Sequence, residues 1–181
     1  MLFNNENTSH IVGYLLWKAG SKMSYLKLLK LVYLADRKAL LENGDTLTGD
    51  CYVAMKLGPV PNFTYNRVKQ NQLEPWLECR GYEVRLTITV NKQDPLETFD
   101  LLSENSKSIL DCIWEKYGHY TKYNLSQLTH SICPEWEACK NYNIELAHIL
   151  KAEGYSSKKI HSALERIAAA DRLEAFSNKL R

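Results

Sequence analysis

The segment from Ser24 to Gly44 constrains the fold more than any other part of the sequence. Ser24 is of a residue type that begins helices, and Gly44 of the type that ends them. Most positions between them are apolar, and the apolar residues recur at helical spacing. A helix that is apolar on almost all sides must be surrounded by other elements. We therefore expect this helix at the centre of the fold.

Four charged residues of this segment need an explanation. Lys27, Lys30 and Arg37 share one narrow face of the helix, so we expect a basic stripe that meets solvent or a charged partner. Asp36 falls instead among apolar residues. A carboxylate in such a setting requires hydrogen-bond donors, so Asp36 is expected to accept backbone N–H groups from a neighbouring loop.

Shorter elements are predicted before and after this helix. A helix is expected from about residue 9, capped by Thr8 or Ser9, and a strand over residues 51–57 followed by a rigid corner at residues 58–61. Asn62 is suited to cap a short helix. The strict alternation of residues 82–90 predicts a strand, paired with residues 96–101 in a hairpin.

The last part of the sequence returns to helical patterns. Helices are expected after Ser103, through residues 125–132, over residues 144–153, and from Ser156 to Leu180. No linker or repeat divides the chain. We expect one predominantly helical α+β domain over residues 1–181, with a small antiparallel sheet inserted among about seven helices.

Charge and hydropathy argue against two classes of partner. The net charge of +2 gives no broad basic face for a phosphate backbone, so nucleic acid is an unlikely ligand. No stretch approaches the ~18 consecutive apolar residues of a membrane span, and the N-terminus lacks the pattern of a secretory leader. The sequence predicts a cytoplasmic protein without a membrane partner.

The five cysteines form an odd set without a Cys-x-x-Cys pair, which favours free thiols. His130, Cys133 and Cys139, with Cys112, lack the paired spacing of a zinc site. Cys133 or Cys139 could pair with His119 or His130 as nucleophile and base, but five histidines and five cysteines produce such pairings by chance. We expect no catalytic residue, no metal and no cofactor.

Tyrosine is unusually frequent, with eleven residues. Tyr117, Tyr120 and Tyr123 gather at the end of a predicted helix. Tyrosine combines apolar area with a polar group and is enriched where proteins meet. The three side chains are therefore expected either at a protein interface or half-buried at the rim of the helical core.

Several segments together resemble the Panacea, or SocA-like, antitoxin family. They are residues 28–36, Leu47-Thr48-Gly49, residues 52–56 and Gly58-Pro59-Val60, and residues 125–130, Trp136 and residues 149–155 extend the resemblance over about residues 9–175. The family-signature residues are Tyr33, Asp36, Gly58, Pro59, Val60 and Trp136. Two features differ from the family pattern: Glu135 separates Pro134 from Trp136, and we expect no DNA-binding or zinc module before the domain.

The resemblance implies an antitoxin, often prophage-associated, that inactivates a cognate protein toxin encoded nearby by binding it. The candidate toxin contacts are Lys27, Lys30, Arg37, Tyr117, Tyr120 and Tyr123. A proteolytic adaptor that delivers the toxin to a protease is an alternative, and a Cys/His enzyme or a nucleic-acid-binding regulator are weaker ones. The sequence leaves self-association open.

Overall fold

The computed structural model describes residues 2–91, 94–139 and 142–179. Its elements, in chain order, are α1 (Asn5–Lys18), β1 (Lys22–Ser24), α2 (Tyr25–Asn43), β2 (Tyr52–Met55), β3 (Gly58–Pro61), α3 (Asn62–Lys69), β4 (Leu77–Arg80), β5 (Glu83–Leu86), the 3-10 helix η1 (Pro95–Glu97), α4 (Glu104–Tyr117), α5 (Lys122–Ile132), α6 (Pro134–Ala138), β6 (Asn143–Ile144), α7 (Leu146–Ala152) and α8 (Ser157–Lys179). The fold is α+β and predominantly helical, as the sequence predicts.

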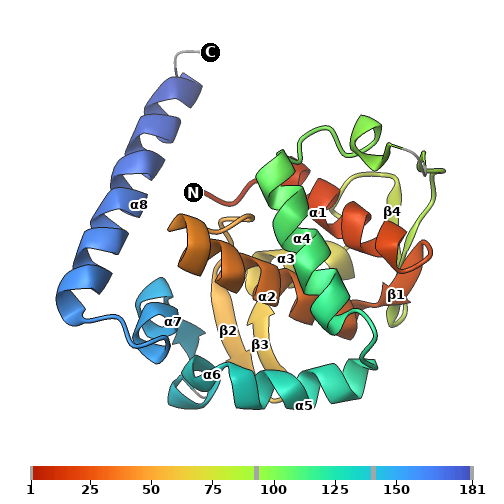
Figure 1. Cartoon of the computed structure of the whole chain (residues 1–181). Coiled ribbons are helices and arrows are strands. Elements are labelled where there is room, and N and C mark those ends of the chain that lie inside the picture. Colours follow the sequence, from red (N-terminus) through yellow and green to blue (C-terminus); the bar gives the residue numbers. More distant parts are fainter. Residues whose placement is uncertain (1, 92–93, 140–141, 180–181) are drawn as a thin grey trace.

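Helix α2 occupies the centre of the molecule, and this prediction is confirmed. The Ser24 hydroxyl accepts the Lys27 N–H at 3.3 Å, and Gly44 ends the helix with a φ of +78°. Every residue from Leu28 to Asp36 is buried. Helices α1, α4 and α5 and strand β3 pack around it (Figure 1). The apolar residues 28–36 of α2 are thus covered by neighbouring elements.

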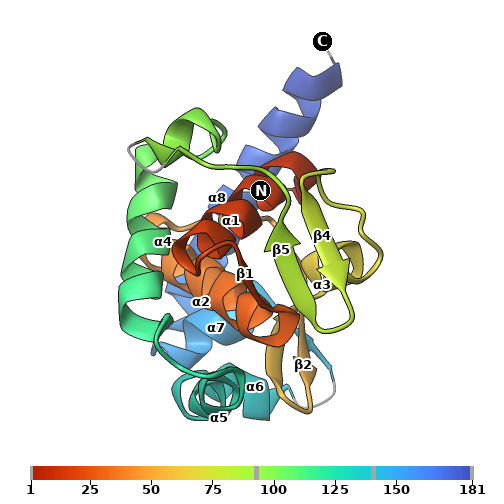
Figure 2. The ribbon, with the colours of Figure 1, turned by 90° about the vertical axis from the view of Figure 1, so that its right-hand side faces the viewer.

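The strands form two small antiparallel sheets in the described ranges, where the sequence predicted one. One sheet has the order β1-β5-β4 and the other the order β3-β2-β6 (Figure 2). The predicted hairpin between residues 82–90 and 96–101 is wrong, because β5 pairs with β4 and β1 instead. Residues 95–97 form the helix η1, which Asp94 caps through the Leu96 N–H at 3.1 Å. Alternation identifies a strand and its faces but not its partner.

Residues 58–61 form strand β3 and not the predicted corner. β3 pairs with β2 in antiparallel register, with Val60 opposite Val53 and Gly58 opposite Met55. The strand tolerates Pro59 and Pro61 because β3 lies at the edge of its sheet, where a missing N–H breaks no ladder. The chain reverses at residues 56–57, so these residues are the tip of a hairpin.

Helix boundaries near the N-terminus also differ from the prediction. α1 begins at Asn5, with Asn4 as cap: the Asn4 side chain accepts the Asn7 N–H at 3.0 Å. The predicted caps Thr8 and Ser9 lie inside the helix, where their hydroxyls donate to carbonyls one turn earlier. The prediction that Asn62 caps a helix is wrong as well, because α3 has Pro61 at that position.

Helix α8 extends beyond the rest of the molecule (Figures 1 and 2). Ala163 and Ile167 in its first half are buried, whereas Leu173 and Phe176 are 71% and 64% exposed. Leu180, predicted on the same helix, lies outside the described residues. In the described ranges, no helix is both long and apolar enough to cross a membrane.

Candidate functional site

Asp36 anchors the loop that follows α2. Its carboxylate accepts the N–H groups of Leu47 and Thr48 at 2.9 and 3.0 Å, and the hydroxyls of Thr48 and Tyr52 at 2.5 and 3.0 Å. Burial raises the pKa of Asp36 to about 7, although these four donors favour the ionised form. Asp36 therefore accepts N–H groups from a neighbouring loop, as the sequence predicts.

The side chains of the basic stripe of α2 form contacts within the protein. Lys30 has no exposed surface, and its Nζ donates to the Pro59 carbonyl at 2.6 Å. The prediction that this stripe meets solvent is wrong for Lys30, and a residue without exposed surface cannot contact a partner. Lys27 Nζ donates to the Gly118 carbonyl at 2.6 Å and lies over the Trp114 ring. Its surroundings leave Lys27 only half-buried.

Arg37, the third member of the stripe, forms a partly buried ion-pair network. Arg37 Nε lies 2.8 Å from the Glu135 carboxylate, which also accepts the Tyr33 hydroxyl at 2.7 Å. The Glu135 side chain is completely buried. Arg37 also bonds Glu153 at the end of α7. In the sequence, Glu135 departs from the family pattern; in the structure, it joins α2 to α6.

Three side chains hold the hairpin formed by β2 and β3. Trp136 Nε1 donates to the Met55 carbonyl at 2.8 Å, Ser126 Oγ to the Leu57 carbonyl at 2.6 Å, and Lys30 Nζ to the Pro59 carbonyl at 2.6 Å. These donors come from α6, α5 and α2. We call Lys30, Ser126 and Trp136 the hairpin clamp, because together they fix the tip at residues 55–59 from three directions.

Gly58 is required by the same arrangement. Its φ is +100°, which favours glycine, and an added Cβ would lie 2.6 Å from Thr129 Oγ1 and 3.1 Å from Lys30 Nζ. The His130 ring stacks on the Trp136 indole at 3.9 Å, which holds Trp136 against the hairpin. The signature residues Gly58 and Trp136 thus help to hold the hairpin in position.

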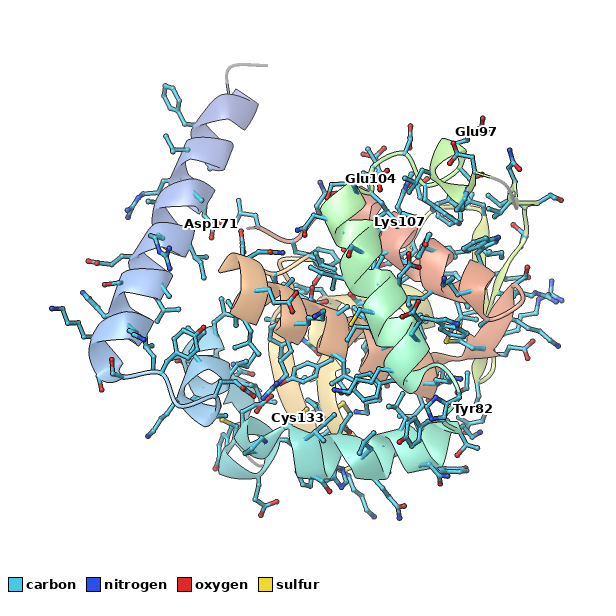
Figure 3. All side chains as sticks on the ribbon, in the orientation of Figure 1. Tyr82, Glu97, Glu104, Lys107, Cys133 and Asp171 are labelled. Atoms are coloured by element: carbon cyan, nitrogen blue, oxygen red, sulfur yellow. The ribbon has the colours of Figure 1, made fainter. Side chains whose placement is uncertain are left out.

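The hairpin tip forms one wall of a groove of about 620 Å³. We call it the tyrosine groove, and its lining residues are Ser24, Tyr25, Leu26, Leu29, Met55, Lys56, Leu57, Val60, Tyr65, Tyr82, Lys122 and Tyr123. Four apolar side chains at its edge are 42–74% exposed: Met55, Leu57, Tyr82 and Tyr123. Figure 3 labels Tyr82 and Cys133 near opposite ends of α5, which places the groove toward the start of that helix.

The three predicted contact tyrosines have different environments. Tyr123 lines the groove and is 62% exposed. Tyr117 is buried in the core, and Tyr120 is half-buried with its ring 4.3 Å from that of His119. Tyr25, Tyr65 and Tyr82 also line the groove, although the sequence did not indicate them as contact residues. They come from separate segments, so no local pattern could have joined them to Tyr123.

Cys133 and Cys139, the two candidate nucleophiles, are not in surroundings that activate a thiol. Cys133 is fully buried, and burial raises its pKa to about 12. Burial also raises the pKa of Cys139. A reactive thiolate needs the opposite shift. The five thiols are free, and no group of three metal-ligating side chains occurs within the described part of the chain.

Comparison with known proteins gives one match. Residues 28–137 match the family described as antitoxin SocA-like, Panacea domain. This segment runs from α2 to α6 and contains the whole hairpin clamp together with the tip of the hairpin. No curated protein and no solved structure matches the chain.

Proposed function

Because the chain belongs to the SocA-like, Panacea domain family of antitoxins, we propose that it neutralises a protein toxin encoded near its own gene by binding it directly. The proposed contact surface is the tyrosine groove. The observation that carries this choice is the convergence of exposed apolar side chains on a concave site whose wall, the β2–β3 hairpin, is fixed by the hairpin clamp.

The composition of the groove supports a protein ligand. Single exposed apolar residues are normal, but several around one concavity mark a binding surface. Tyrosine offers a large contact area with few rotatable bonds, so little entropy is lost when a partner orders it. Tyr82 and Tyr123 are 74% and 62% exposed, and Leu57 is 45% exposed. A partner would therefore bury much new apolar area here.

The hairpin clamp contributes through preorganisation. Ordering a loop on binding costs conformational entropy and so lowers affinity, whereas a groove wall that is already ordered avoids this cost. Three side-chain hydrogen bonds to alternate carbonyls hold residues 55–59 in place. The clamp residues are thus positioning residues for Met55 and Leu57.

Co-expression in a heterologous host tests the proposal. The neighbouring gene product alone should stop growth, and this protein should restore it. The double variant Leu57→Ala, Tyr123→Ala should weaken binding by about 100-fold or more and lose protection, because central contacts carry most interface energy. Leu173→Ala with Phe176→Ala on α8 is the matched control, since these side chains are at least as apolar and at least as exposed as Leu57 and Tyr123.

Two results would contradict the proposal. A neighbouring product that is harmless, or that kills equally with and without this protein, would exclude neutralisation. If the control variant loses protection and the groove variant keeps it, the contact surface lies on α8. Toxin abundance should be measured by immunoblot in the same cells, because direct neutralisation leaves the toxin level unchanged and proteolytic delivery lowers it.

A further inference from the structure

The charges around the tyrosine groove are of one sign. Lys56 and Lys122 line it, and none of its lining residues is aspartate or glutamate. Lys69 lies close by, with its Nζ 4.9 Å from the centre of the Tyr25 ring. Among the described residues, no carboxylate forms an ion pair with any of these three lysines. Their charges are therefore not neutralised by the chain itself.

Several basic side chains elsewhere on the surface have acidic neighbours. Lys18 and Lys107 both pair with Asp111, Lys22 lies 3.7 Å from Glu83, and Arg80 and Arg85 share Glu78. Lys158 and Lys159 on α8 form no ion pair among the described residues either, so the groove is distinguished by lysines without an acidic neighbour that stand beside exposed apolar side chains in one concave site. Complementary charge is what steers and orients partners at such a surface.

The floor of the groove is apolar. Leu29 and Val60 are buried beneath it, and Leu26 is half-buried. Tyr25 and Tyr82 stack on one another with ring centres 5.9 Å apart, so their facing surfaces are already occupied. A floor of aliphatic side chains suits a branched or aromatic side chain of a partner. The volume of about 620 Å³ corresponds to a few side chains and not to a whole protein face.

We infer that the tyrosine groove binds a short acidic segment of the partner toxin, with one large apolar side chain on the groove floor and flanking carboxylates near Lys56 and Lys122. This inference rests on the proposed function and adds the chemistry of the bound segment. A single-stranded nucleic acid fits less well, because such sites follow the phosphate backbone with a basic track and leave aromatic faces open to the bases.

The test uses the purified full-length chain and the purified neighbouring gene product, with the dissociation constant measured at about 50 and 500 mM salt. Lys56→Glu with Lys122→Glu should weaken binding by about 30-fold or more at low salt, because two attractions become repulsions. Added salt should weaken binding of the wild type and strengthen binding of this variant. Lys158→Glu with Lys159→Glu is the control, since it makes the same change of charge on exposed residues of α8. It should change the constant by less than about threefold.

The outcomes separate the inference from the proposed function. If the charge-reversed groove variant binds as tightly as the wild type while Leu57→Ala with Tyr123→Ala does not, the groove binds the toxin, but the inference that the bound segment is acidic is wrong. If neither groove variant changes the affinity, the groove is not the contact surface. A toxic neighbour that does not bind at all overturns both statements. Binding of a fluorescent fifteen-nucleotide oligothymidylate that requires Lys56 and Lys122 would overturn the inference in favour of nucleic acid.

Discussion

Replacing Lys30 with methionine removes a fully buried titratable group from the hairpin clamp. Methionine keeps most of the volume of the side chain but cannot donate to the Pro59 carbonyl. Burial lowers the pKa of Lys30 from 10.5 to about 7. The wild-type chain must therefore lose a proton from Lys30 on folding at neutral to alkaline pH, and the variant need not.

The sign of the effect follows from proton linkage. Between pH 7 and 10.5 the unfolded chain holds the Lys30 proton and the folded chain has released it. Stability therefore rises with pH through this window and is constant with respect to Lys30 below about pH 7. The full difference between the two pKa values corresponds to ~5 kcal/mol. Between pH 7.5 and 9.5 the contribution from Lys30 is ~2–3 kcal/mol.

Urea denaturation at pH 7.5 and 9.5 measures this quantity as a difference between two proteins. The stability of the wild type relative to Lys30→Met should increase by ~2–3 kcal/mol between the two pH values. Ser126→Ala is the control, because it removes another hydrogen bond of the clamp without removing a titratable group. It should cost ~1–3 kcal/mol at both pH values. Equal pH dependence in the wild type and Lys30→Met would refute the reasoning about Lys30.

Two further predictions concern the same framework. Gly58→Ala should lower the free energy of unfolding by ~2–4 kcal/mol, because it combines an unfavourable φ with a Cβ only 2.6 Å from Thr129 Oγ1, and thermal or urea denaturation measures this loss. An unchanged midpoint would mean that the hairpin is not held as described. Glu135→Ala should cost ~3–5 kcal/mol by leaving Arg37 partly unpaired in a buried site, and Glu135→Gln should cost less because it keeps an acceptor for the Tyr33 hydroxyl.

Local signals in the sequence predicted the elements that depend on local chemistry. The serine caps at positions 24, 103 and 156 are present, and each hydroxyl accepts an N–H three residues later. The central position of α2 followed from its apolar character. Asp36 could be assigned an acceptor role because a carboxylate on an apolar face has few alternatives.

Features that depend on contacts between distant segments could not be predicted in the same way. Helical spacing placed Lys30 on a stripe with Lys27 and Arg37, but it could not show that Lys30 is buried against β3. The partner of β5 is decided by packing, not by its alternation. Glu135 bonds residues about a hundred positions earlier, so nothing near it in the sequence indicates its role.

The candidate site shows the same limit most clearly. Tyr123 was predicted as a contact residue, but it becomes part of a groove only beside Tyr25, Leu57 and Tyr82. These residues meet because β2–β3, the β4–β5 turn and the starts of α2 and α5 converge. The signature Gly58-Pro59-Val60 indicates the family. In the structure, this segment is the start of β3 and positions the adjacent exposed hairpin tip.

Hydrogen–deuterium exchange of the free chain and of its complex with the neighbouring toxin tests the central claim most directly. The claim is that the toxin binds at the tyrosine groove. Peptides that cover residues 54–58, 80–84 and 120–125 should exchange more slowly in the complex, while peptides from the second half of α8 should be unchanged. Slower exchange on α8 with no change around the groove would contradict the account.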